Sequence, residues 1–161
     1  MNITVLGTGS VAHSLAAQAA RKGMQVTLVA RTPEQAARLS ALKSLAYNSP
    51  DGDGDVAMSA AVMDAGRAVA DASIVILAVP AYGHEPWLAR AEAALQSGQA
   101  LVVIGSFGGL RILHRRPGLR ARRISVVEVS TSPFPCRSFA PGTVTLYGRR
   151  PSLPAAIYAD R

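Results

Sequence analysis

The sequence predicts an α/β protein with a mainly parallel β-sheet that carries helices on both faces. Apolar segments of strand length alternate along the chain with segments of helical periodicity, which is typical of parallel strands joined by helices. The longest apolar run, Ile74–Val79, has the length of a strand that is buried on both faces. With 161 residues, of which 49% are hydrophobic, the chain is large enough for one core.

The first part of the chain contains two predicted pairs of strand and helix. The elements are a strand at Asn2–Leu6, a helix at Ser10–Lys22 with Gly23 as its stop, a strand at Gln25–Ala30, and a helix from Thr32 to about Leu42. Thr32 and Gln35 have the spacing of a capping box, and Pro33 suits the first helical position.

The alternation continues after a polar turn. We predict two short strands around the turn at residues 49–54, a helix at Asp64–Asp71, a strand at Ser73–Val79, a helix at His84–Gln96, a strand at Ala100–Ile104, a helix at Gly108–Arg115 closed by Pro117-Gly118, and strands at Ile124–Val129 and Thr143–Tyr147. Residues 151–161 have the spacing of an opening helix, with Leu153, Ile157 and Tyr158 as its apolar positions.

A glycine-rich motif directly follows the first predicted strand. Its residues are Gly7, Thr8, Gly9, Ser10, Val11 and Ala12, which fit the pattern G-x-G-x-x-A. Gly7 permits a tight turn, Gly9 lets the backbone approach a pyrophosphate, and Ala12 allows the helix to pack closely on the sheet. Free amides and the positive end of the helix dipole would face the phosphates. The motif therefore predicts a Rossmann-type, doubly wound fold that binds a dinucleotide.

The end of the second predicted strand indicates which dinucleotide is bound. An NAD site usually places a carboxylate there to bond the ribose hydroxyls, but the first acidic residue after this strand is Glu34. Arg31 can instead pair with a 2′-phosphate, and Thr32 can donate a hydrogen bond to it. We therefore expect NADP(H) to be favoured over NAD(H); the alternative is that Arg31 is only a solvated loop residue.

The segment after the strand at Ser73–Val79 is expected near the nicotinamide, because ligands of such sheets lie beyond the carboxyl ends of the strands. The predicted cofactor neighbours in it are Val79, Pro80, Ala81 and Tyr82. His84 is a weak candidate for a catalytic residue, since it could also cap the next helix. The glycines of Gly105–Gly109 permit close ligand approach after the next strand.

Composition excludes several classes of protein. No apolar run approaches the length of a membrane span, and the N-terminus lacks the basic region of a signal peptide. A single cysteine, Cys136, excludes an internal disulfide framework and a cysteine-rich zinc site, and we predict no metal site. Cys136 has no neighbouring base in the sequence, so we interpret it as a packing residue. We expect a cytoplasmic protein.

The chain is basic, with 17 Lys+Arg against 10 Asp+Glu and a formal net charge of +7. One window contains Arg111, Arg115, Arg116, Arg120, Arg122 and Arg123. Such a window can bind phosphates, but the aromatic platforms that usually accompany nucleic-acid binding are missing. We therefore do not expect a nucleic acid as partner.

Four segments together resemble the N-terminal domain of the octopine/nopaline (opine) dehydrogenases. They are residues 7–13 (GTGSVAH), 74–85 (IVILAVPAYGHE), 103–109, and 127–137 (VEVSTSPFPCR) followed by 144–148. The glycine motif is widespread, whereas VPAYGHE and TSPFPCR, in that order, are much more specific. The resemblance extends over nearly the whole chain.

The resemblance implies an enzyme that condenses the amino group of an amino acid with a 2-oxo acid and reduces the imine with hydride from NAD(P)H. It also implies a helical substrate domain that carries the catalytic residues, a His–Asp pair and an arginine. We accordingly expect residues 1–150 to form the dinucleotide-binding domain and residues 151–161 to begin a truncated connection to the absent substrate domain. The chain is then expected to bind NADPH without catalysing the reaction alone.

Three alternatives stay open at this point. The chain could be the cofactor domain of a ketopantoate reductase-like enzyme or 2-hydroxy-acid dehydrogenase, although residues 80–85 and 131–137 argue against this. It could be a non-catalytic nucleotide- or nucleic-acid-binding module that uses the arginine window. It could also be a structural homodimer, formed through the surface that a missing domain would cover.

Overall fold

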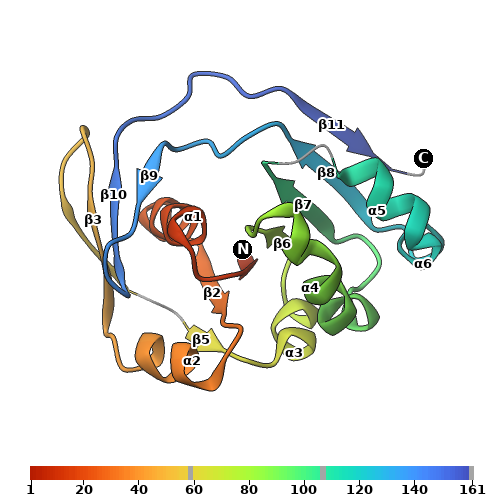
Figure 1. Cartoon of the computed structure of the whole chain (residues 1–161), viewed down its shortest axis with the longest axis horizontal. Coiled ribbons are helices and arrows are strands. Elements are labelled where there is room, and N and C mark those ends of the chain that lie inside the picture. Colours follow the sequence, from red (N-terminus) through yellow and green to blue (C-terminus); the bar gives the residue numbers. More distant parts are fainter. Residues whose placement is uncertain (58–59, 106–107, 160–161) are drawn as a thin grey trace.

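A seven-stranded sheet forms the centre of the molecule in a computed structural model that describes residues 1–57, 60–105 and 108–159 (Figure 1). Its strand order is β11-β8-β7-β6-β1-β2-β5. The strands are β1 (Asn2–Leu6), β2 (Gln25–Val29), β5 (Ala60–Val62), β6 (Ile74–Leu77), β7 (Ala100–Ile104), β8 (Ser125–Val129) and β11 (Ala155–Tyr158). All neighbours are parallel except β11, which runs antiparallel to β8. The predicted doubly wound, mainly parallel sheet is thereby confirmed.

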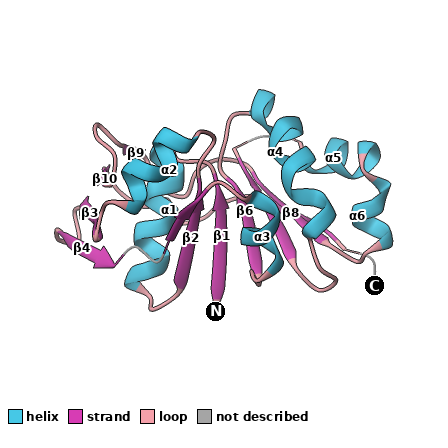
Figure 2. Ribbon diagram, turned by 90° about the horizontal axis from the view of Figure 1, so that it is seen from below, coloured by secondary structure: helices cyan, strands magenta, loops and turns pink. Residues whose placement is uncertain are grey.

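Helices cover both faces of this sheet (Figure 2). They are α1 (Ser10–Arg21), α2 (Pro33–Ser40), α3 (Ala65–Ala70), α4 (His84–Ala91), α5 (Gly109–Arg115) and α6 (Pro117–Ala121), with 3₁₀ turns η1 (Ala81–Gly83) and η2 (Glu92–Ala94) beside α4. Because side chains alternate along a strand, Val5 of β1 packs toward α1, whereas Leu6 packs toward α3 and α4. The sheet therefore has two separate hydrophobic cores, one on each face.

A second, four-stranded sheet flanks α1 on the side away from the large sheet (Figure 1). Its strand order is β4-β3-β10-β9, with β3 (Ser44–Asn48), β4 (Gly54–Ala57), β9 (Cys136–Arg137) and β10 (Thr143–Leu146). The strands expected around the polar turn and after residue 142 are present, but their union into one sheet was not predicted. The parallel pairing of β3 with β10 joins segments that are about 100 residues apart, which no local pattern reveals.

The C-terminal segment forms a strand, so the helix expected in residues 151–161 is wrong. Pro154 has no N–H to donate to a preceding helical turn, whereas its carbonyl accepts a hydrogen bond from Ser130 at 3.0 Å. The following residues pair with the open edge of β8, where Tyr158 packs against the core and Ile157 is 71% exposed. The domain boundary predicted at residue 150 stays a prediction.

Two smaller expectations also need correction. Pro117-Gly118 does not simply close a helix, because Pro117 is the first residue of α6, a position that proline favours. The helix expected to reach Gln96 ends at Ala91 and tightens into η2. Neither change alters the arrangement of the sheet. Within the described ranges, no helix combines the length and apolar character that a bilayer span requires.

Ion pairs attach α5 and α6 to α4 and use much of the arginine window. Arg116 bridges two carboxylates, at 2.7 Å to Glu85 and with a closer contact to Glu92. Arg115 also approaches Glu85, at 3.6 Å, and Arg122 approaches Glu92, at 3.5 Å. These arginines are therefore engaged within the protein, which weakens the case for a polyanion partner at this window.

A buried amide ends α3 and joins it to the strand β7. Gln99 is 5% exposed, and its Nε2 donates to the carbonyl oxygens of Val69 and Ala72 at 2.7 and 2.6 Å. Its Oε1 accepts from the amide of Gln96 at 2.7 Å. One buried side chain thus bonds a carbonyl of the last turn of α3 and a carbonyl just after it.

We predict that Gln99→Leu lowers the free energy of unfolding by about 1–3 kcal/mol, because it removes a buried side-chain donor from the carbonyl oxygens of Val69 and Ala72. Urea denaturation followed by circular dichroism measures the change. Gln96→Leu is the matched control, since the same substitution falls on an exposed side chain. Equal effects of the two substitutions would contradict the assigned role.

Candidate functional site

The segments predicted to bind a cofactor come together at one edge of the large sheet. β1 lies between β2 and β6, and all three strands run in the same direction. Their carboxyl ends therefore present the glycine motif, Arg31-Thr32 and the segment after β6 side by side. The chain order reverses between β1 and β6, which is where ligands bind in doubly wound sheets.

The glycine motif has the backbone geometry that its sequence predicted. Gly7 has a φ of +121°, and a Cβ on it would lie 2.8 Å from Val79 Cγ1 and 3.0 Å from the Ala78 carbonyl oxygen. Any side chain at this position would therefore be strained and would collide with the end of β6. Ala12 lies on the buried face of α1 and is fully buried, as its predicted packing role requires.

The N-terminus of α1 is open toward solvent. Gly9 is its N-cap, with an extended backbone, and no atom lies within 4 Å of the place where a Cβ would stand. No side chain caps the helix, and its first turn contains no acidic residue. The amides of Ser10, Val11 and Ala12 thus sit at an uncapped positive end of a twelve-residue helix. This arrangement can accept an anion such as a pyrophosphate.

The turn after β2 is held in place by the start of α2. Thr32 Oγ1 accepts a hydrogen bond from the Gln35 amide at 3.3 Å, and Gln35 Oε1 accepts one from the Arg31 amide at 3.2 Å. The expected cap by Thr32 is thus confirmed. In a capping box the Gln35 side chain would accept from the amide of Thr32, but here it accepts from the amide of Arg31. Arg31 itself is exposed, so its guanidinium is available at the edge that the glycine motif occupies.

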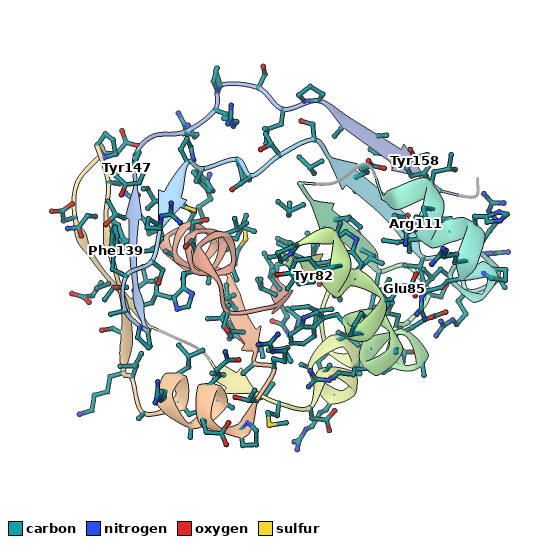
Figure 3. The ribbon with its side chains drawn as sticks, in the orientation of Figure 1. Tyr82, Glu85, Arg111, Phe139, Tyr147 and Tyr158 are labelled. Carbon is teal, nitrogen blue, oxygen red and sulfur yellow. The ribbon has the colours of Figure 1, made fainter. Side chains whose placement is uncertain are left out.

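The segment after β6 contacts the glycine motif through Val79, which lies against both Gly7 and Gly83. Pro80 and Ala81 are exposed. Tyr82 is 84% exposed and stands at the start of α4 (Figure 3). The structure thus places Val79 beneath the site, and it leaves Pro80, Ala81 and Tyr82 open to a ligand.

His84 occupies a different environment from these neighbours. It is 5% exposed, and its ring hydrogen-bonds the backbone of Val79. Burial lowers the pKa of its imidazole, and that hydrogen bond only partly opposes the shift. Its Nε2 is enclosed and has no hydrogen-bond partner among the described residues. A catalytic role for His84 stays a prediction, and a capping role is not seen, since no side chain caps α4.

The loop after β7 reaches the same edge of the sheet. Gly105 has a φ of +74°, while Ser106 and Phe107 lie outside the described residues. The loop ends at Gly109, whose amide donates to the buried carboxylate of Glu128 at 2.9 Å. That hydrogen bond links the loop to β8, and no sequence pattern had singled out Glu128.

The structure adds a pocket of about 280 Å³ next to the glycine motif. Thr8 and His13 line it from one side, Arg38 of α2 from another, and Phe139 from the loop between β9 and β10. Phe139 is 79% exposed and lies on the β10 side of α1 (Figure 3). Sequence reasoning missed Arg38 and Phe139. Arg38 could have been found, because it is a second arginine in the helix that directly follows Arg31 and Thr32.

The remaining candidates do not form a reactive centre. Cys136 is partly buried on β9 and packs against the core around α1, which agrees with a packing role. Among the described residues, no group of three or more His, Cys, Asp or Glu side chains could hold a metal ion.

Comparisons with known proteins decide the family. Residues 2–106 match the family model described as NADP oxidoreductase, coenzyme F420-dependent, and this match covers more than half of the chain. The chain belongs to this family. A curated relative, the opine dehydrogenase of Arthrobacter sp. (strain 1C), is 30% identical over 146 residues, which are 88% of this chain and 40% of the relative.

Solved structures agree with this placement. An octopine dehydrogenase in complex with NADH and agmatine superposes with a TM-score of 0.85 at 25% identity, over 98% of this chain and 42% of that one. A ketopantoate reductase from Ralstonia eutropha JMP134 gives a TM-score of 0.70 at 20% identity, over 92% and 47%, and shares the fold alone. The chain spans about two fifths of its opine dehydrogenase relatives. The prediction of an opine dehydrogenase-like, nucleotide-cofactor-binding Rossmann domain is confirmed.

The stability of this domain should fall as the pH drops below about 6.5, the ordinary pKa of histidine. Burial lowers the folded-state pKa of both His13 and His84, so the unfolded chain takes up protons first and stability rises with pH across this window. We predict that His13→Gln reduces the loss of unfolding free energy between pH 7.5 and 5.5. Urea denaturation at each pH measures it, with the exposed His114→Gln as control. An unchanged pH dependence in His13→Gln would contradict the linkage.

Proposed function

We propose that this domain binds NADP(H) across the carboxyl ends of β1, β2 and β6. The observation that carries the proposal is the uncapped N-terminus of α1, which is open at Gly9 and lies beside the exposed Arg31. The dinucleotide pyrophosphate would accept hydrogen bonds from the amides of Ser10, Val11 and Ala12. Thr8 and Gly9 would approach it through their backbone, because no side chain fills the space at Gly9.

The 2′-phosphate would lie at Arg31 and Thr32. A guanidinium pairs with a phosphate through two parallel hydrogen bonds, so Arg31 would supply the charge that holds the 2′-phosphate. The first acidic residue after β2, Glu34, lies in the first turn of α2, where its carboxylate accepts a hydrogen bond from the Thr32 side chain. Arg38 lines the adjacent pocket beside Thr8 and adds positive charge on the same side. This arrangement favours NADP(H) over NAD(H), although the octopine dehydrogenase structure compared above contains NADH.

The nicotinamide would lie over the segment after β6. Val79 supports this segment from below, and Pro80, Ala81 and Tyr82 supply an exposed apolar surface for the ring. When bound, the cofactor supplies a hydride at this end of the site. The protein's own contribution here is to orient the ring and to exclude water from one of its faces.

The whole protein would be an opine dehydrogenase-like enzyme. The amino group of an amino acid and a 2-oxo acid would condense to an imine with loss of water, and hydride and a proton would then reduce the imine to a secondary amine. The groups that act on these substrates would belong to a separate helical domain, as the resemblance implies. The 30% identity to an opine dehydrogenase supports this substrate class over that of the ketopantoate reductases. The compartment would be the cytoplasm.

Arg31→Ala is the sharpest test of the cofactor assignment. We predict that it weakens NADPH binding by about 10- to 100-fold, the range expected when a charge-assisted hydrogen-bonded pair is lost, and NADH binding by less than about threefold. Titration followed by cofactor fluorescence measures both affinities. Arg149→Ala, at an exposed position outside the site, is the control. An equal loss of both affinities would exclude Arg31 as the 2′-phosphate ligand.

The isolated chain should bind NADPH and yet form no product. With an amino acid such as arginine and with pyruvate, we expect no secondary amine above background, because the substrate-binding groups are assigned to another domain. Mass spectrometry of the reaction mixture detects the product. Clear turnover by this chain would contradict the assignment of the substrate-binding groups to another domain. A failure to bind NADPH would contradict the proposed function itself.

A further inference from the structure

His13 of α1 makes hydrogen bonds in two directions. Its Nδ1 donates to the Gly9 carbonyl oxygen at 3.1 Å, and its Nε2 accepts from the Gly142 amide at 3.3 Å. An amide N–H can only donate, so Nε2 is the unprotonated nitrogen and the proton is on Nδ1. The ring is 2% exposed, and burial lowers the pKa of the imidazole, which favours this neutral form.

The loop between β9 and β10 is thereby connected to the glycine motif at two points. Besides the bond from Gly142 to His13, the amide of Ser138 donates to Ser10 Oγ at 3.0 Å. Gly142 is itself tied to the small sheet, because its carbonyl accepts from the Ala46 amide of β3 at 2.8 Å. A continuous series of hydrogen bonds therefore runs from the small sheet through Gly142 and His13 to Gly9.

This series ends on a peptide group that faces the proposed pyrophosphate. The carbonyl of Gly9 and the amide of Ser10 belong to one planar peptide unit, so fixing the oxygen also fixes the direction of the N–H. The Gly9 oxygen accepts both the His13 side chain and the His13 amide, at 3.1 and 3.0 Å. The backbone bond is the ordinary first hydrogen bond of the helix, and the side-chain bond from His13 adds a second restraint on the same oxygen.

We propose that His13 is a positioning residue for dinucleotide binding, and that the loop 138–142 is part of the cofactor site through it. The inference rests on the proposed function, since it concerns the same pyrophosphate. It goes beyond that function because Ser138 and Gly142 lie outside residues 2–106, the part that matches the family model. The small sheet then holds the phosphate-binding amides in the orientation that the ligand needs, rather than merely covering α1.

The test uses the whole 161-residue chain and NADPH titration with three variants. His13→Ala removes both hydrogen bonds and should raise the Kd for NADPH about tenfold, while His13→Gln, whose amide can donate and accept, should stay within about threefold of the wild type. Thr4→Val removes a partly buried hydrogen bond to the Ala68 carbonyl oxygen on the other face of the sheet, at 2.6 Å, and should change the Kd less than twofold. Circular dichroism establishes that each variant is folded.

Hydrogen exchange on the wild-type chain gives a second readout that needs no variant. NADPH should slow exchange at the amides of Ser138 and Gly142, because a ligand that stabilises the first turn of α1 also stabilises the bonds to it. If NADPH binds the wild type but His13→Ala binds equally well, or if the two amides are unaffected, the inference is wrong. If the wild type does not bind NADPH, the proposed function fails and the inference falls with it.

Discussion

The close approach of Gly7 to the end of β6 is the constraint on which the site depends. A glycine with φ of +121° lets β1 turn directly into α1, and the absence of a side chain lets Val79 and Ala78 pack against that turn. The open end of α1 is thereby set beside the segment after β6, at the point where the strand order reverses. One packing contact between neighbouring strands thus joins the proposed phosphate position to the proposed nicotinamide position.

The uncapped N-terminus of α1 explains why this helix needs support on both sides. A helix whose N-terminus is left uncapped keeps its free amides only if other contacts hold its first turn. The buried Ala12 and Ala16 pack in a core to which both sheets contribute, and the loop between β9 and β10 adds hydrogen bonds to His13 and Ser10. Both sheets therefore hold α1 in place beside the proposed phosphate position.

Much of the fold followed from local pattern, while the support around the site did not. The glycine motif, the apolar strand after Ser73 and the Thr32 cap depend on residues close together in the chain, so their spacing revealed them. His13 and Gly142 are 129 residues apart, and neither belongs to a pattern that names the other. The C-terminal strand was mistaken for a helix because four residues do not separate the two periodicities. Its form is decided by the open edge of β8.

The central claim is that a dinucleotide phosphate binds at the N-terminus of α1 and not at the arginine window. Amide chemical-shift mapping by NMR, during titration of the chain with NADPH, tests this most directly. We predict that the largest shifts fall on the amides of residues 9–12 and of Arg31 and Thr32, with only small changes in residues 111–123. Shifts concentrated in residues 111–123, with residues 9–12 unaffected, would contradict it.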